Sequence, residues 1–128
     1  MEHWLSYLRG RVFETFGRPL DAIDAYRATL QMNAAFHRAA NRLAYTLASL
    51  QRYAEAEQCF RVVLRLVPGN AVAHFNLAFT LEKLGQYEGA VQEFQQATRL
   101  NAKIDRAWYG LGMCQAHLGR HAAAVAAL

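Results

Sequence analysis

Residues 84–90 read LGQYEGA, and related phrases recur along the chain at a fixed spacing of 34 positions. The related phrases are FGRPLDA at 16–22, LQRYAEA at 50–56 and LGRHAAA at 118–124. A fixed period of this length is typical of proteins that stack copies of one supersecondary unit. The sequence therefore predicts a repeat architecture over nearly the whole chain of 128 residues.

Apolar residues on both sides of the repeated phrase have helical spacing. Two sets lie at i, i+4 and i+7 on either side of Gly85: Leu77, Leu81, Leu84 and Ala90, Phe94, Ala97. Gly85 stands where a residue in the left-handed conformation commonly ends a helix. Each unit is therefore predicted to be a helix, a tight turn and a second helix. The first helices are expected near 3–16, 37–50, 71–84 and 105–118, and the second near 19–33, 53–67, 87–101 and from 121 onward.

Small residues occupy two columns when the units are aligned: Gly10, Ala44, Ala78, Gly112 and Ala22, Ala56, Ala90, Ala124. Small side chains let two antiparallel helices approach to about 8–10 Å. The aromatic residues Phe60 and Phe94 follow on the second helices. They are predicted to be buried core residues that fill the gap to the next unit, and not to contact a ligand.

These columns resemble the tetratricopeptide repeat, a helix-turn-helix unit of 34 residues. The best-matching unit has the family's residue types at Leu77, Ala78, Gly85, Tyr87, Ala90, Phe94 and Ala97. The second unit matches through Tyr53, Ala56, Phe60 and Pro68, and the fourth through Trp108, Leu111 and Gly112. The first unit is the weakest, with Arg9 where an apolar residue is usual.

The resemblance implies an all-α fold, a right-handed superhelix (α-solenoid) of antiparallel helical hairpins with about three and a half to four units. The units are expected at 3–36, 37–70, 71–104 and, incomplete, 105–128, forming a single array over 1–128. Since the chain stops before its fourth unit would close, the sequence is predicted to be a fragment of a longer protein.

Composition and motifs argue against several classes of function. The formal net charge of +4 is mild, so a nucleic-acid partner is not expected. No apolar run reaches membrane-spanning length. The sequence has no phosphate-binding loop, HExxH or GxSxG motif, so an enzyme, a cofactor and a metal site are not expected. Cys59 and Cys114 are isolated, which favours free thiols in a reducing, cytoplasmic setting.

The resemblance also implies that the first helix of each unit lines a concave groove. The inward positions give these candidate peptide-binding residues: Tyr7, Arg11, Arg38, Asn41, Arg42, Tyr45, Phe75, Asn76, Phe79, Arg106 and Tyr109. Arginine and aromatic residues are common in interface hot spots. Basic residues outnumber the acidic Glu14 and Glu82 at these positions, which favours a partner segment of acidic character. Alternatively, the aromatic rings help to pack neighbouring first helices.

Two groove arginines lead to an expectation about stability. Arg42 and Arg106 are predicted to lie on exposed faces, where charge reversal leaves stability nearly unchanged. A clamp for a chaperone's terminal carboxylate, known in the family, is matched by Asn41, Asn76 and Arg106. It is incomplete, because Tyr45 and Gly110 stand where an asparagine and a cation are expected.

The sequence thus predicts a non-catalytic scaffold whose groove binds a protein or peptide segment. The alternative is a substrate-recruiting or tethering module of a larger enzyme, such as a glycosyl- or sulfotransferase. The apolar stretch at 122–128 also predicts end-to-end self-association, because exposed apolar patches tend to find partners.

Overall fold

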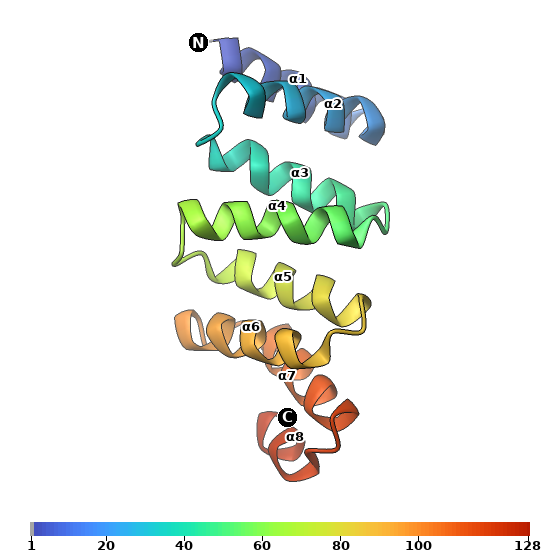
Figure 1. Cartoon of the computed structure of the whole chain (residues 1–128), viewed down its shortest axis with the longest axis vertical. Coiled ribbons are helices and arrows are strands. Elements are labelled where there is room, and N and C mark those ends of the chain that lie inside the picture. Colours follow the sequence, from blue (N-terminus) through green and yellow to red (C-terminus); the bar gives the residue numbers. More distant parts are fainter. Residues whose placement is uncertain (1) are drawn as a thin grey trace. The chain divides into compact units, whose positions relative to one another are not determined.

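The computed structural model describes residues 2–128, which form eight α-helices and no strand (Figure 1). The helices are α1 (Glu2–Thr15), α2 (Pro19–Met32), α3 (His37–Ser49), α4 (Tyr53–Leu66), α5 (Ala71–Lys83), α6 (Tyr87–Leu100), α7 (Asp105–His117) and α8 (His121–Ala127). Each predicted boundary lies within a residue of the observed one. The helical spacing in the sequence therefore confirms itself in the fold, and the protein is an all-α chain of helical hairpins.

The chain divides into two compact units, unit 1 up to Val67 and unit 2 from Pro68 to Leu128. In unit 1, α1 packs on α2, α2 on α3 and α3 on α4. In unit 2, α5 packs on α6, α6 on α7 and α7 on α8. The division falls at the Pro68-Gly69 pair, which breaks helices strongly. Within residues 2–128 we find no helix with the length and apolar character needed to span a membrane.

A residue in the left-handed conformation follows the first helix of every hairpin. The φ angle is 71° at Gly17, 62° at Gln51 and 76° at both Gly85 and Gly119. The next amide then donates to a carbonyl in the last turn, as from Gln86 to Leu81 at 2.9 Å. This is the pattern of a Schellman cap. It confirms the helix end predicted at Gly85 and explains why glycine fills three of the four positions in this column.

Replacing Gln51 by glycine should stabilise the protein by about 0.5–1 kcal/mol. A non-glycine residue in the left-handed conformation is disfavoured by about 1–2 kcal/mol, and the greater freedom of glycine in the unfolded chain offsets part of that gain. Urea denaturation measures the change as a shift of the midpoint at constant m value. Ala54→Gly, at an exposed position in α4, is the control and should destabilise. A destabilisation in both variants would contradict the strain at Gln51.

Close helix packing depends on the small columns, as predicted. Ala22, Ala56 and Ala90 are fully buried. A Cβ atom on Gly10 would lie 2.4 Å from Cε1 of Tyr26, so the tyrosine ring rests directly on the backbone of α1. Phe60 and Phe94 are each 1% exposed, which confirms that both are core residues.

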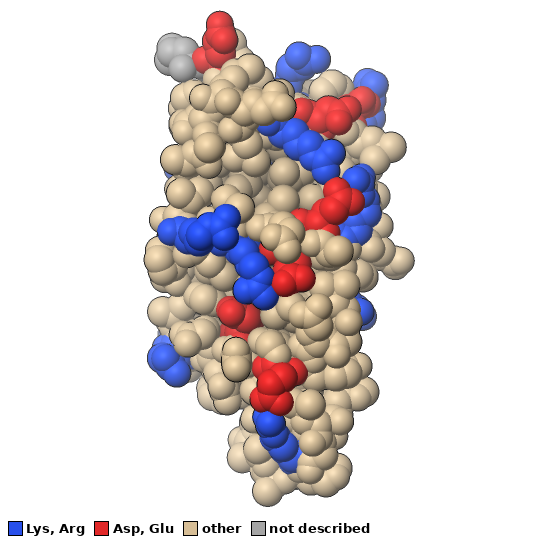
Figure 2. Space-filling view, viewed as in Figure 1, with Lys and Arg blue, Asp and Glu red and all other residues tan. Residues whose placement is uncertain are grey.

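Charged side chains on the surface form short-range pairs of opposite sign. On the face that Figure 2 displays, acidic and basic side chains lie beside one another. In unit 1, Arg27 and Arg52 approach Glu55 at 2.9 and 2.8 Å. In unit 2, Arg120 approaches Glu88 at 2.9 Å. These pairs are exposed and contribute about 0–1 kcal/mol each, so they mark a solvated outer surface rather than a site.

Candidate functional site

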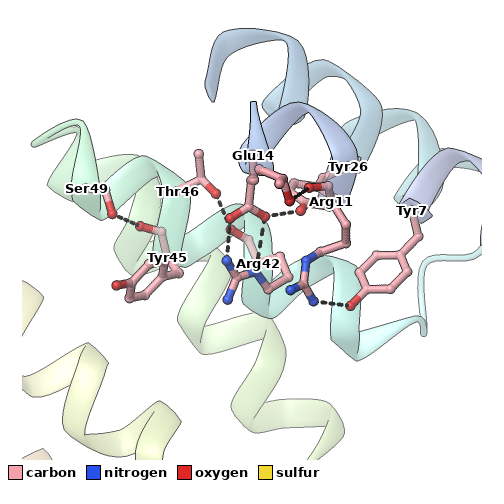
Figure 3. A network of polar contacts seen from close by, with 9 residues as sticks. Tyr7, Arg11, Glu14, Tyr26, Arg42, Tyr45, Thr46 and Ser49 are labelled. Atoms are coloured by element: carbon pink, nitrogen blue, oxygen red, sulfur yellow. Dashed lines mark hydrogen bonds and ion pairs between the residues drawn. The ribbon is translucent and has the colours of Figure 1, made fainter. Parts of the chain in front are cut away.

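A cluster of polar side chains joins three helices of unit 1 (Figure 3). The carboxylate of Glu14 on α1 accepts a hydrogen bond from the hydroxyl of Tyr26 on α2. It also accepts two from the guanidinium of Arg42 on α3, with Nε 3.1 Å from Oε1 and Nη2 bonded to Oε2. We call Glu14, Tyr26 and Arg42 the Glu14 cluster. A paired geometry of this kind is the strongest form of an arginine–carboxylate contact.

The three groups of the Glu14 cluster shift one another's ionisation. Burial by itself would raise the pKa of Glu14, but the hydrogen bonds from Arg42 and Tyr26 and the charges of Arg42 and Arg11 hold this pKa below its ordinary value. Burial and the neighbouring carboxylate raise the pKa of Tyr26. The hydrogen bond to Glu14 raises the pKa of Arg42. The carboxylate is therefore charged, the phenol neutral and the guanidinium cationic.

Arg42 is not the free surface cation that the sequence predicted. Its side chain is 29% exposed and that of its partner Glu14 is 16% exposed. Removing one member of such a pair leaves the other charge partly buried without compensation. The expectation that reversing the charge of Arg42 leaves stability nearly unchanged is therefore wrong, because an acidic residue three helical turns away from its own helix start meets the guanidinium from α1.

Two predicted groove residues on α1 contact each other. Tyr7 is only 8% exposed, and its ring packs edge-to-face on Trp4 and Phe36, with centroid distances of 6.0 and 5.3 Å. Arg11 donates to the hydroxyl of Tyr7 at 3.3 Å. Arg11 itself is exposed. The ring of Tyr7 therefore packs between elements of unit 1, and Arg11 presents a cation at the surface.

The remaining predicted residues of unit 1 lie on α3. The guanidinium of Arg38 lies 5.5 Å from the ring of Trp4, and that of Arg42 lies 5.2 Å from the ring of Tyr45. Tyr45 is 50% exposed. Asn41 is half-buried, and its Oδ1 atom has no hydrogen-bond partner among the described residues. Arg38 and Tyr45 thus leave a cation and an aromatic ring open to solvent on this helix.

Unit 2 holds a pocket of about 380 Å³, which we call the unit 2 pocket. Side chains from three helices line it: Phe75, Phe79 and Glu82 of α5, Phe94 of α6, and Asp105, Arg106, Tyr109 and Gly110 of α7. Its volume lies at the small end of the range for ligand pockets, about 300–1,000 Å³. It is large enough for one side chain of a partner rather than for a large cofactor.

Gly110 gives the pocket its depth. A Cβ atom at this position would lie 2.4 Å from Cζ of Phe94, so no side chain fits there unless Phe94 moves. The ring of Phe94 forms the floor, and Phe75 lies beside it with a centroid distance of 5.9 Å. At the same place in the second and third units the sequence has Arg42 and Asn76. The missing side chain therefore opens the surface of unit 2 down to a core ring.

The unit 2 pocket brings together four of the predicted groove residues, Phe75, Phe79, Arg106 and Tyr109. Asn76 is not among the residues that line it. Sequence reasoning missed Phe94, which was assigned only to the core, as well as Asp105 and Gly110. The signal that could have indicated this place was the glycine itself, since no other unit has a glycine at that position.

Other kinds of chemistry have little support in the described residues. Between residues 2 and 128, no three His, Cys, Asp or Glu side chains come together as metal ligands. Burial raises the pKa of Cys59, and burial with the nearby charge of Glu82 raises the pKa of Cys114 to about 12. A protonated, buried thiol packs as a small apolar group.

Solved structures with a similar fold share little sequence with the chain. A crystal structure of MamA superimposes with a TM-score of 0.93 at 17% identity and covers 98% of this chain and 73% of that one. MamA residues 41 to the end from Desulfovibrio magneticus RS-1 give a TM-score of 0.88 at 20% identity, covering 95% and 69%. MamA from AMB-1 gives 0.91 at 20% identity, covering 95% and 67%. These similarities establish an α-solenoid fold and nothing about a ligand.

Family membership comes from the sequence itself. No curated protein matches the chain significantly. The sequence profile described as Tetratricopeptide repeat, however, matches residues 7–71 and 75–128, which is most of the chain. The match agrees with the period of 34 residues, the buried small columns and the left-handed turn residues. The chain therefore belongs to the tetratricopeptide repeat family.

Proposed function

We propose that this chain is a non-catalytic scaffold that binds segments of a partner protein on the surfaces formed by its first helices. The family and its fold support a role in protein interaction in general. The observation that carries the finer proposal is the unit 2 pocket, an apolar recess with arginine and tyrosine at its rim. Concave, largely apolar recesses with a few polar groups are the usual form of a binding site.

In unit 1 the surface favours a partner segment of acidic character. Arg11 and Arg38 are exposed and form no ion pair with a carboxylate among the described residues. Arg42, in contrast, already has Glu14 as its counter-charge. The guanidinium of Arg38, stacked on Trp4, is well placed to bind a carboxylate with two hydrogen bonds, since its flat face is occupied and its edge is free.

Reversing the charge of Arg38 should weaken the binding of acidic peptides about five- to tenfold at low salt, because an attraction is replaced by a repulsion of similar size. Peptides selected from a random dodecapeptide library on the intact protein are the probes. Fluorescence anisotropy measures their affinity for the Arg38→Glu variant. Raising the salt concentration should weaken the wild-type interaction, because exposed charges are screened over about 8–10 Å.

The matched control is Arg65→Glu, which reverses an exposed arginine on α4 of the same unit. It should leave the affinity within about twofold of wild type, since a change of about 0.4 kcal/mol corresponds to that factor. If both reversals weaken binding equally, a general charge effect explains the result and the proposed surface on the first helices is wrong. If no peptide is enriched on the protein, the scaffold function itself fails.

Self-association is a second part of the proposal. Large apolar side chains of α1 form an exposed stripe, with Leu5 68%, Leu8 52% and Val12 52% exposed. On α8, Val125 is 75% and Leu128 is 71% exposed. Two different apolar surfaces on one molecule permit head-to-tail contacts between copies. This is the end-to-end association that the sequence predicted from residues 122–128.

Sedimentation velocity should therefore show an average mass that rises with protein concentration. The double variant Leu8→Lys/Val12→Lys should remain monomeric at concentrations where the wild type associates, because two charges in the stripe cannot be desolvated without large cost. Gln31→Lys, at an exposed position of α2, is the control for added charge. A wild-type protein that stays monomeric up to millimolar concentration would contradict the association.

A further inference from the structure

We infer that the unit 2 pocket binds a large apolar side chain of a partner segment, and that a basic residue next to this side chain pairs with Glu82 or Asp105. The inference rests on the proposed function and gives that site its ligand chemistry. It differs from the acidic preference of unit 1, because the two surfaces carry different charges.

The lining of the pocket is dominated by aromatic rings. Phe75, Phe79, Phe94 and Tyr109 surround it, and the rings of Phe75 and Phe94 lie 5.9 Å apart at an angle of 59°. Phe94 is 1% exposed, so only the part of its ring left uncovered by Gly110 faces the pocket. An aromatic or long aliphatic side chain would remove this apolar surface from water, which is the main driving force for filling such a recess.

A cation is a poorer candidate for the pocket itself, because the protein's own cations already occupy two of the rings. The guanidinium of Arg106 lies 5.3 Å from the centroid of Phe75. The ammonium of Lys83 lies 5.2 Å from the centroid of Phe79. An incoming lysine or arginine would compete with these contacts and be repelled by both charges. The pocket therefore selects an apolar side chain over a charged one.

The carboxylates of the pocket determine what flanks the apolar side chain. Glu82 at the end of α5 and Asp105 at the start of α7 both line the pocket. Neither forms an ion pair with a cation among the described residues, whereas the other acidic groups of unit 2, Glu88 and Glu93, have partners in Arg120 and His74. Two uncompensated carboxylates beside an apolar recess complement a basic residue of the partner, which lowers the energy of the encounter and fixes its direction.

Four synthetic nonapeptides test the inference on the intact protein. They share a Gly-Ser framework, and their three central residues are Lys-Phe-Lys, Lys-Ser-Lys, Glu-Phe-Glu or Ser-Phe-Ser. Backbone amide chemical shifts of unit 2 are followed during each titration. We expect Lys-Phe-Lys to bind at least tenfold more tightly than Lys-Ser-Lys and several-fold more tightly than Glu-Phe-Glu. The shifts should be largest for residues that line the pocket.

Variants of the pocket separate its two elements. Tyr109→Ala removes an exposed wall (the side chain is 61% exposed) and should weaken the peptides that contain Phe by about tenfold without unfolding unit 2. Glu82→Gln and Asp105→Asn should each reduce the preference for Lys-Phe-Lys over Ser-Phe-Ser and leave Ser-Phe-Ser unchanged. Asp24→Asn, an exposed carboxylate on α2 of unit 1, is the matched control and should change no affinity.

Three results would overturn the inference: equal binding of Lys-Phe-Lys and Lys-Ser-Lys, tighter binding of Glu-Phe-Glu, or shifts outside the pocket that persist in Tyr109→Ala. The absence of binding by all four nonapeptides would overturn it too. The proposed function fails on a different observation, namely that no peptide from the random library is enriched on any surface of the protein. The two failures can therefore be told apart.

Discussion

Replacing Phe94 by alanine should lower the free energy of unfolding by about 3–5 kcal/mol, the range for a buried phenylalanine that leaves a cavity. The side chain is 1% exposed and its ring touches both Phe75 and the backbone at Gly110. The hole cannot close easily, since the neighbouring backbone at Gly110 carries no side chain that could turn inward. Urea denaturation followed by circular dichroism measures the loss.

The control for this variant is Phe16→Ala, which truncates the same residue type at a position that is 76% exposed. It should change the stability by less than about 0.5 kcal/mol. A loss of less than 1 kcal/mol in Phe94→Ala, or equal losses in both variants, would show that α6 does not present Phe94 to the core of unit 2.

Arg42→Glu should destabilise the protein by about 2–4 kcal/mol, because it breaks a partly buried ion pair and places a second carboxylate against Glu14. Arg38→Glu is the matched control, since it makes the same change on the same helix at an exposed position without an ion pair. The control should stay within about 0.5 kcal/mol of the wild type. Equal stability of the two variants would contradict the Glu14 cluster.

The same cluster predicts a dependence of stability on pH. Because folding lowers the pKa of Glu14, its contribution is complete above the ordinary pKa of 4.5 and is lost as the pH falls through the lower value in the folded state. The stability difference between the wild type and Glu14→Gln should therefore be largest near neutral pH and should shrink in acid. A difference that stays constant between pH 7 and pH 3 would contradict this linkage.

The helices were predictable because their determinants are local. A spacing of apolar residues, a glycine after each first helix and a proline at 68 fix where helices begin and end, and these signals lie within a few residues of the structure they specify. The left-handed residue at Gln51 shows that the turn geometry holds even where glycine is absent. The repeat itself carried this information from one unit to the next.

The candidate site was less predictable because it depends on contacts between residues far apart in the chain. Helical spacing placed Arg42 on a first helix but could not show that Glu14, 28 positions earlier, would neutralise its charge. Gly110 was read as a missing cation, whereas its significance is the access that it gives to Phe94. Which charges remain free is a property of the packed helices and not of the pattern.

The central claim is that partner segments bind on the first helices of each unit. The most direct measurement is a map of backbone amide chemical shifts in the intact protein during titration with a peptide selected from the random library. We predict saturable shifts in α1 and α3 of unit 1, around Arg11, Arg38 and Tyr45, or in α5 and α7 around the unit 2 pocket. Shifts confined to the exposed faces of α2, α4 and α6 would contradict the claim.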